Sequence, residues 1–495
     1  MKHKPETQLP NGNVNTATTE LQPQGYEERL LAEFIKLLGA HRWVFKQERS
    51  FSRCAVLILG MIFAFARHTV TQCVLSIGQG GRDWSAWYRL FSGKRFKQDD
   101  LDEVLLQETL KHVPEDQPYL VVTDGTQTAH TSKNMPGCGL GISHRSPAFA
   151  RGLHLCRRWV TCAWLPPIVD GFSRAIPLKF LDAFTPKSAP ASVKPRSETA
   201  ATLVFLDWLR ARLDGCKRSG QWIVALADGA FDTKTMWKNL PERVVLIVRT
   251  AKNRALCELP GQYVGKWRPR QYGAAVPTPQ QRLKERFGWK HQDIKVRGRI
   301  KHMRFKIYGA YLRKEIPTTP MFLLVIDAYR WAGRNKSGRR VSREREEVFY
   351  LISAVKRNGI WELPYPAETL LQWAWQRWEV EVTHRDLKAG FGIGQMQCWG
   401  QVSSVMATRW GVWVFALMLL SAYRAWGWQV PFALNCAWWG GAQRWSFNTV
   451  WRYFRAALWK LPTFRALAGL SGATAEKVAA AWPFLAHSVL AAARA

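Results

Sequence analysis

The sequence is poor in acidic residues. Its 495 residues contain 37 Asp and Glu against 71 Lys and Arg, so the formal net charge is +34 and the pI is near 10.2. A charge of this size opposes a compact fold unless a polyanion is the partner. Nucleic acid is the first candidate for that polyanion, and an anionic membrane is the second.

The sequence also lacks an apolar run long enough to cross a bilayer. The longest runs, 54–66 and 410–423, fall short of the roughly 20 residues that a spanning helix needs. We expect both to be buried helices of a globular protein, and no membrane partner.

Paired cysteines and a secretion signal are missing as well. The nine cysteines form no C-x-x-C pair, which excludes a zinc ribbon and does not suit a disulfide framework. Residues 1–25 are polar without an apolar centre, so we expect a disordered tail. These features fit a reducing compartment, and we predict a protein that is cytoplasmic in a cell without a nucleus, or that otherwise reaches chromosomal DNA.

Apolar spacing divides the rest of the chain into regions. Residues 26–115 have a helical period, and 69–97 have the outline of a helix-turn-helix, although two helices packed for structure alone give the same pattern. In 116–250, three strands, a helix, a strand, a helix and a strand predict an α/β domain with a mixed sheet. We expect 346–400 to complete this domain with one helix over 367–389, and 401–495 to be helical.

The segment 251–345 interrupts the α/β pattern and is expected to be a β-rich insertion. Between positions 281 and 314 it has 12 Lys or Arg but only Glu285 and Asp293, a density that favours contact with a phosphate backbone. We expect Arg297, Arg299 and Lys301 to bind DNA phosphates. Tryptophan is concentrated later, with 15 of 26 after position 360, which predicts a large core or a subunit interface after position 400.

Three carboxylates occur in an order that carries chemical meaning. Asp124 and Asp228 follow buried strands, "YLVVT" and "WIVALA", and Glu381 lies on the helix after the insertion. At 100° per residue, Glu381 shares a helix face with Arg377 and Lys388, whereas Glu379 lies opposite, so Glu379→Gln should be close to silent. An ordinary salt-bridged helix face would show the same stripe. The order of the carboxylates is nevertheless that of an RNase H-like nucleotidyl transferase.

Three segments together resemble DDE transposases of bacterial insertion sequences, in the cut-and-paste group with a β-rich insertion. "RWEVEVTHRDLK" (377–388) matches the R-x3-E-x6-K part of the YREK-type signature, "VVTDGTQ" resembles the first-Asp segment, and "VALADGAF" with "VVLIVRT" resembles the second. The resemblance covers residues 117–399. It departs at Ala374, where the family has Tyr, so that either Trp373 or Trp375 supplies the aromatic or the contact is absent.

The resemblance implies an RNase H-like fold and a site. Asp124, Asp228 and Glu381 would be catalytic ligands of two Mg²⁺ ions about 4 Å apart, with Mn²⁺ able to substitute, and Arg377 and Lys388 would bind phosphates near the cut.

It also implies partners and a route. A homodimer would bind the inverted-repeat ends of a transposon and target DNA, and would transfer the 3′-OH through a hairpin intermediate. Trp289 and Trp331 are candidates for stacking on a flipped base, with core packing as the alternative. A catalytically idle DNA-binding descendant and a structure-selective RNase H-like nuclease are the other interpretations.

Overall fold

The computed structural model describes most of the chain. The described residues are 25–64, 67–77, 79, 81, 83–132, 134–143, 152–190, 193–261, 269–330, 344–428 and 444–460. The expected disordered tail lies outside this set apart from Gly25, and Trp331 also lies outside it.

The N-terminal region is helical, as predicted. Its helices are α1 (Tyr26–Ala40), α2 (Glu48–Phe63), α3 (Val70–Ser76), α4 (Ser85–Tyr88) and α5 (Gln98–Leu110), with 3-10 turns over Arg42–Val44 and Arg89–Phe91. The second helix of the expected helix-turn-helix, α4, is a single turn of four residues with Trp87 buried. This helix continues directly into the 3-10 turn over Arg89–Phe91, and DNA reading by the pair stays a prediction beside the structural alternative.

A mixed sheet follows, which confirms the predicted fold class. Its first strands are β1 (Tyr119–Ala129), β2 (Cys138–Ile142), β3 (Leu153–Trp164), β4 (Ile176–Ala183), β5 (Ile223–Ala227) and β6 (Val244–Arg249), joined by α6 (Glu198–Gly215), a 3-10 turn (Gly229–Phe231) and α7 (Lys234–Lys238). Strands β1, β5 and β6 are parallel, and β3 is antiparallel to β1. The sequence did not predict β2.

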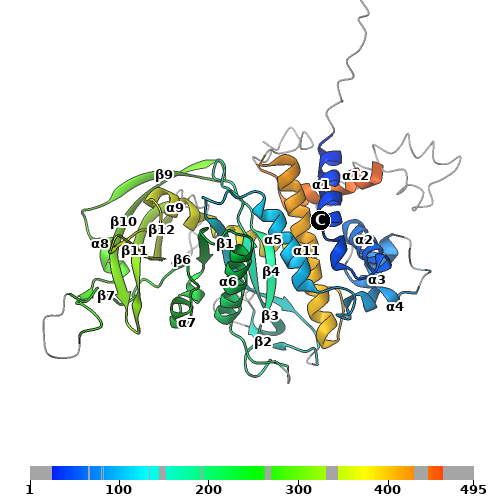
Figure 1. Ribbon diagram of the computed structural model, residues 1–495, viewed down its shortest axis with the longest axis horizontal. Coiled ribbons are helices and arrows are strands. Elements are labelled where there is room, and N and C mark those ends of the chain that lie inside the picture. The colour runs from blue at the N-terminus through cyan, green and yellow to red at the C-terminus, as the bar shows by residue number, and fades with distance from the viewer. Residues whose placement is uncertain are drawn as a thin grey trace, which may run out of the picture.

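The insertion continues this sheet instead of forming a separate one. It contains β7 (Leu256–Glu258), β8 (Ala275–Val276), α8 (Pro279–Lys284), β9 (Lys290–Val296), β10 (Arg299–Arg313) and β11 (Ile316–Arg330). The returning strand β12 (Glu344–Ser353) pairs with both β11 and β6. The strand order is β2-β3-β1-β5-β6-β12-β11-β10-β7-β8, with β4 on β3 and β9 on β10, so the insertion extends one sheet across the molecule (Figure 1).

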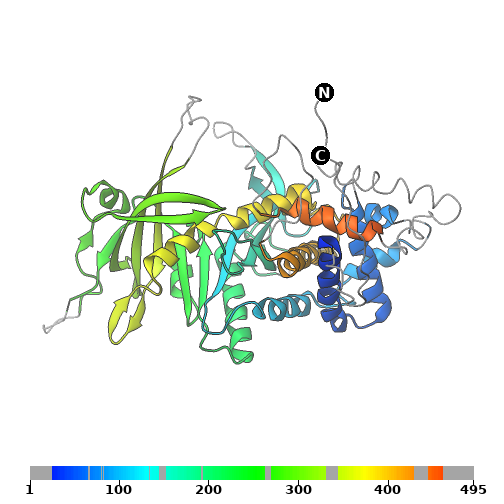
Figure 2. The same cartoon turned by 90° about the horizontal axis from the view of Figure 1, so that it is seen from above.

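The helix predicted over 367–389 is interrupted. After the small hairpin β13 (Val355–Arg357) and β14 (Ile360–Glu362), the structure has α9 (Ala367–Gln376), α10 (Glu379–Arg385) and a π-helical turn, η4 (Asp386–Gly390). At the junction, Val380 N and Glu381 N donate to the carbonyls of Arg377 and Trp378, three residues back, which tightens the helix at this point. In Figure 2 these yellow helices run from the insertion, over the sheet, toward the C-terminal helices.

The C-terminal region forms core. Helix α11 (Gln401–Trp426) is long and apolar enough to cross a membrane, yet 83% of its most apolar window is buried inside the protein, where it packs on α1, β4 and α5. Trp410 and Trp413 on α11, and Trp445 before α12 (Phe447–Lys460), are buried within the same chain. The apolar runs 54–66 and 410–423 are therefore buried helices where described, as predicted, and these tryptophans serve the core of one chain.

Candidate active site

Asp124 and Asp228 lie at one edge of the parallel strands. Thr123 of β1 pairs with Ala227 of β5, so the two aspartates that follow them come at the same level of the sheet. The Asp124 carboxylate accepts a hydrogen bond from Gly125 N at 2.8 Å. Because ligands collect at the carboxyl ends of parallel strands, this edge is a natural place for a polar site.

Arg377 brings Glu381 to the same edge. Its guanidinium donates to Glu381 Oε1 at 2.7 Å and lies 3.9 Å from Asp228 Oδ1. Burial alone would lower the pKa of Arg377, but the charge of Asp228, the nearby Tyr350 and the Glu381 carboxylate raise it above its ordinary value. The guanidinium therefore stays charged and joins a strand-end aspartate to the helix glutamate.

The electrostatics of Asp124 show that all three carboxylates interact. Burial in the first place, with the negative charges of Asp228 and Glu381, raises the pKa of Asp124 to about 7 against the opposing charge of Arg377. A carboxyl group in this setting is ionised readily only when more positive charge is present.

His384 is a neighbour of Asp124 in the structure. Its Nε2 lies 2.7 Å from Thr161 Oγ1 and its Nδ1 lies 3.8 Å from Asp124 Oδ2. Burial, followed by the charge of Lys388, lowers the pKa of His384 to about 3, so the ring is neutral and packed. Thr161 faces Asp124 across the β1–β3 ladder, and this pairing of distant strands, which the local sequence does not show, brings His384 to Asp124.

The donor set suits a divalent cation of the Mg²⁺ type. All three carboxylates offer oxygen, which a hard cation prefers, and their mutual repulsion is what such an ion would relieve. Within the described residues, no three Asp, Glu, His or Cys side chains converge closely enough to hold a metal ion as they stand. Arg377 lies between Asp228 and Glu381, so Glu381 would have to leave Arg377 to bind the ion.

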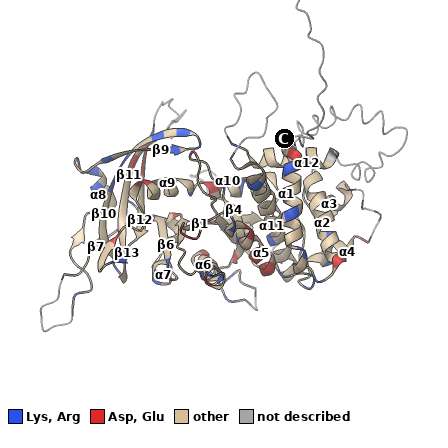
Figure 3. Ribbon diagram, turned by 45° about the horizontal axis from the view of Figure 1, so that its top comes forward, with Lys and Arg blue, Asp and Glu red and all other residues tan. Residues whose placement is uncertain are grey.

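The predicted phosphate contacts of the insertion differ from one another. Lys and Arg gather along β9 and the adjacent end of β10 (Figure 3), where Arg299 is exposed. Arg297, in contrast, binds Glu379 at 2.9 Å. Lys301 binds Glu346 at 2.6 Å. For Arg297 and Lys301, phosphate binding would require an exchange of partner.

The structure places the aromatic candidates as follows. Trp289 is half-buried, its ring centre lies 4.5 Å from the cations of both Arg304 and Lys306, and its indole N–H donates to the Glu285 carbonyl. Its ring is thus already in contact with two cations. Trp331 lies outside the described residues.

Position 374, where the resemblance is broken, is in contact with a tyrosine of another element. The Tyr350 hydroxyl on β12 donates to the Ala374 carbonyl at 3.3 Å. Trp373 packs on Tyr365, and Trp375 lies under the Lys301 ammonium. The aromatic hydroxyl at this stretch of helix therefore comes from β12.

Glu379 contradicts the expectation of a silent position. It lies on the face opposite Glu381, as predicted, but it is buried and its carboxylate binds Arg297 and Arg444 at 2.9 and 3.0 Å. The expectation was wrong because helical periodicity gives the face of a residue and not what packs against that face.

Comparison with known proteins identifies the family. A family model described as DDE superfamily endonuclease matches residues 36–304, more than half of the 495-residue chain. The match includes Asp124 and Asp228 but ends before Glu381, so that residue joins the site through the geometry above. A comparison with curated proteins gave no match. The chain belongs to the DDE superfamily of endonucleases, which act on DNA.

Proposed function

We propose that the protein is a DNA transposase of the insertion-sequence type. The observation that carries the proposal is the pair of ion pairs made by Arg377, one with Asp228 and one with Glu381. The charges of the same two carboxylates raise the pKa of Asp124. Three carboxylates, from β1, the end of β5 and α10, thus lie close enough for their charges to interact, in a chain of this family.

Asp124, Asp228 and Glu381 would hold two Mg²⁺ ions, with Mn²⁺ able to substitute. When bound, such ions activate the attacking oxygen and stabilise the leaving one. Arg377 would grip a phosphate oxygen with its planar fork once Glu381 is released. Lys388, near His384 on the same helix face, would hold a neighbouring phosphate. Neutral His384 would keep the Asp124 side chain oriented without adding charge.

The proposed reaction has four steps. Water would attack a phosphodiester at the element's end, forming a new P–O bond and releasing a 3′-OH. That 3′-OH would then attack the phosphodiester of the opposite strand to give a hairpin, and a second water would reopen it before transfer to target DNA. In each step one P–O bond forms and one breaks, so no oxidant or reductant is needed.

Two ends must be held together, so we propose a homodimer on the inverted repeats in the bacterial cytoplasm, at the nucleoid. The buried tryptophans of α11 pack within one chain, so an interface in the region after position 400 would use its other residues. Light scattering of the complex with end DNA should show two chains, and a monomeric complex that joins strands would contradict this.

The proposed function is tested at Glu381. Glu381→Gln keeps the shape of the side chain but removes the charge that a metal ion requires. We expect nicking of a labelled end duplex in Mg²⁺ to fall by about a thousandfold or more, with folding and DNA binding retained.

The matched control is Glu368→Gln on the preceding helix. Glu368 is exposed in the first turn of α9, so its replacement should leave nicking within about twofold, since exposed charges contribute little. Equal activity of the two variants would refute the role of α10 in catalysis, and it would favour a DNA-binding protein that no longer cuts.

A further inference from the structure

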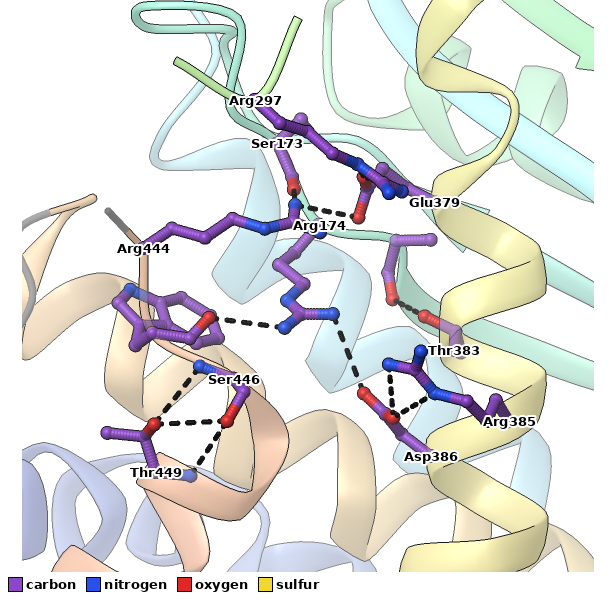
Figure 4. A network of polar contacts seen from close by, with 12 residues as sticks. Ser173, Arg174, Arg297, Glu379, Thr383, Arg385, Asp386, Arg444, Ser446 and Thr449 are labelled. Carbon is purple, nitrogen blue, oxygen red and sulfur yellow. Dashed lines mark hydrogen bonds and ion pairs between the residues drawn. The ribbon is translucent and has the colours of Figure 1, made fainter. Parts of the chain in front are cut away.

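A buried ion cluster lies behind the candidate active site, on the opposite face of helix α10. Glu379 has only 2% of its side chain exposed and is bound by two arginines from distant parts of the chain. Arg297 comes from the tight turn between β9 and β10, and Arg444 from the segment before α12. Figure 4 shows both guanidinium groups directed at the Glu379 carboxylate.

The backbone of the turn over residues 170–175 contacts the insertion, the end of α9 and the segment before α12. The Gly171 carbonyl accepts from Arg297 N at 3.0 Å and from the Gln376 amide at 3.1 Å. The Ser173 carbonyl accepts from Arg444 at 3.0 Å. The insertion, the end of α9 and the C-terminal segment thus dock on one short turn.

Only glycine fits at the centre of this turn. Gly171 has φ +75°, and a Cβ there would lie 2.2 Å from the Lys295 carbonyl oxygen. The close approach of the backbones of the turn and the β9–β10 hairpin therefore depends on the missing side chain.

Helix α10 is attached to the turn further along its length. Thr383 Oγ1 donates to the Ala175 carbonyl at 2.7 Å, and Arg174 lies 3.5 Å from Asp386. Burial, and then the charge of Arg444, lowers the pKa of Arg174 to about 10. Arg174 also donates to the Trp445 carbonyl, so its charge is compensated from two sides.

These contacts matter because α10 has little rigidity of its own. It has seven residues, follows a tightened junction and runs into a π-helical turn. A helix this short is held by tertiary packing and not by its own hydrogen bonds, so its rotation depends on what grips its buried face. Glu379 and Glu381 are two residues apart, about 200° around the helix axis. Contacts that fix the direction of the Glu379 side chain therefore also fix the direction in which Glu381 points.

We propose that Glu379, held by Arg297 and Arg444, is a positioning residue that sets the rotation of α10 and so aims Glu381 at the metal-binding edge. A buried carboxylate between two arginines is costly unless its geometry is kept, which makes the cluster a stiff support. A metal ligand must be held within about 0.5 Å of its place. The inference rests on the proposed function, because it assumes that Glu381 binds metal.

The test is Mn²⁺ binding to the full chain with end DNA, measured by electron paramagnetic resonance, which does not depend on turnover. Glu379→Gln places an amide nitrogen, which cannot accept a hydrogen bond, against one arginine. We expect Mn²⁺ affinity to fall by about tenfold or more, with affinity for the end duplex changed by less than about twofold.

Asp327→Asn is the matched control. Asp327 is also a buried carboxylate between two arginines, Arg304 and Arg345, but it lies in β11 and makes no described contact with α10. The Asp327→Asn variant should have a lower free energy of unfolding and an unchanged affinity for Mn²⁺. An equal loss of Mn²⁺ affinity in both variants would mean general destabilisation and would overturn the inference.

A double-mutant cycle tests the route of the effect. If Arg297 acts through Glu379, the single variant Arg297→Gln lowers Mn²⁺ affinity, but the double variant binds Mn²⁺ no more weakly than Glu379→Gln does. Additive losses of affinity in the double variant would overturn the proposal. If Glu379→Gln does not fold, the same cycle is run with Arg297→Gln and Arg444→Gln, which share the carboxylate and should again be non-additive.

Glu381→Gln separates failure of the inference from failure of the function. If it leaves Mn²⁺ binding intact, the proposed function fails and the inference with it. If it abolishes binding while Glu379→Gln changes nothing, the proposed function stands and only the positioning role is refuted.

Discussion

Single residues decide the electrostatics of the candidate site, and one cation organises it. Arg377 is almost buried, and both of its described ion pairs are to proposed metal ligands. Its positive charge would partly take the place of the proposed metal ions. DNA that binds Arg377 would release Glu381, so substrate binding and metal binding should support each other.

The sequence could predict this much because the three carboxylates and Arg377 have local signatures. Asp124 and Asp228 each follow a short apolar stretch, although β1 continues beyond Asp124, and Arg377 and Glu381 have i, i+4 spacing. The contact of His384 with Asp124 and the burial of Glu379 could not be predicted, because each depends on which distant element packs against the helix. The same holds for Tyr350 at Ala374.

A residue far from the site should control acid stability. His41 is fully buried and in edge contact with Trp413, and burial lowers its pKa from 6.5 to about 4 against the hydrogen bond to the Leu37 carbonyl. The unfolded chain takes up the proton first as the pH falls, so this stabilising contribution is complete above pH 6.5 and is lost between about 6.5 and 4. The loss from this one group should reach about 3 kcal/mol.

Denaturant unfolding of the DNA-free protein across this pH range measures the effect. His41→Gln should reduce the slope of the free energy of unfolding against pH by the equivalent of about one proton. Replacing exposed His291 should leave this slope unchanged. An unchanged slope in His41→Gln would show that this ring is not the group that titrates.

At the scale of elements, the sequence predicted the order of helices and strands but missed their interruptions. Strand β2 has the sequence "CGLGI", whose glycines weaken any strand pattern, and it is stabilised only by pairing with β3. The junction in the helix that carries Glu381 lies at Arg377 and Trp378, both with helical backbone angles. Local periodicity cannot show such a junction, since it arises where the helix is fitted to the turn over 170–175.

The contact between α5, β4 and α11 gives a prediction at this scale. Asp99 and Asp102 of α5 both bind Lys179 of β4 and Arg409 of α11, but the Asp102 side chain is 5% exposed and that of Asp99 is 70% exposed. Asp102→Asn removes the buried partner charge of two buried cations and should lower the free energy of unfolding by about 3 kcal/mol.

Asp99→Asn is the paired comparison and should cost less than about 1 kcal/mol, because water screens an exposed ion pair. Thermal and denaturant unfolding of the two variants measure the difference. Similar losses would show that burial does not distinguish these two aspartates.

For the whole molecule, the excess of positive charge indicates DNA, but part of it is compensated inside the fold. Arg297 and Lys301 neutralise Glu379 and Glu346, a use of basic residues that composition cannot reveal. Arg299 is exposed and is therefore a better candidate for binding a phosphate than Arg297 or Lys301.

Binding to an end duplex should therefore weaken steeply as salt rises. Arg299→Gln should reduce the slope of log affinity against log salt by about 1. Lys301→Gln should change it less, because Lys301 has a carboxylate partner at 2.6 Å. Fluorescence anisotropy between about 50 and 200 mM salt covers the useful range, and a flat response in the unaltered protein would remove the argument from charge.

The shared sheet also fixes an order of events during synthesis. Strand β6 ends at Arg249 and its partner β12 begins at Glu344, so the ribosome must add the intervening residues, in about 5 to 20 seconds, before that edge can be closed. Until then the nascent chain presents an open strand edge that could pair wrongly. The helix that carries Glu381 follows β12 after only a small hairpin and α9. The growing chain therefore completes its sheet and its third carboxylate in quick succession, and neither is present while the insertion is still being made.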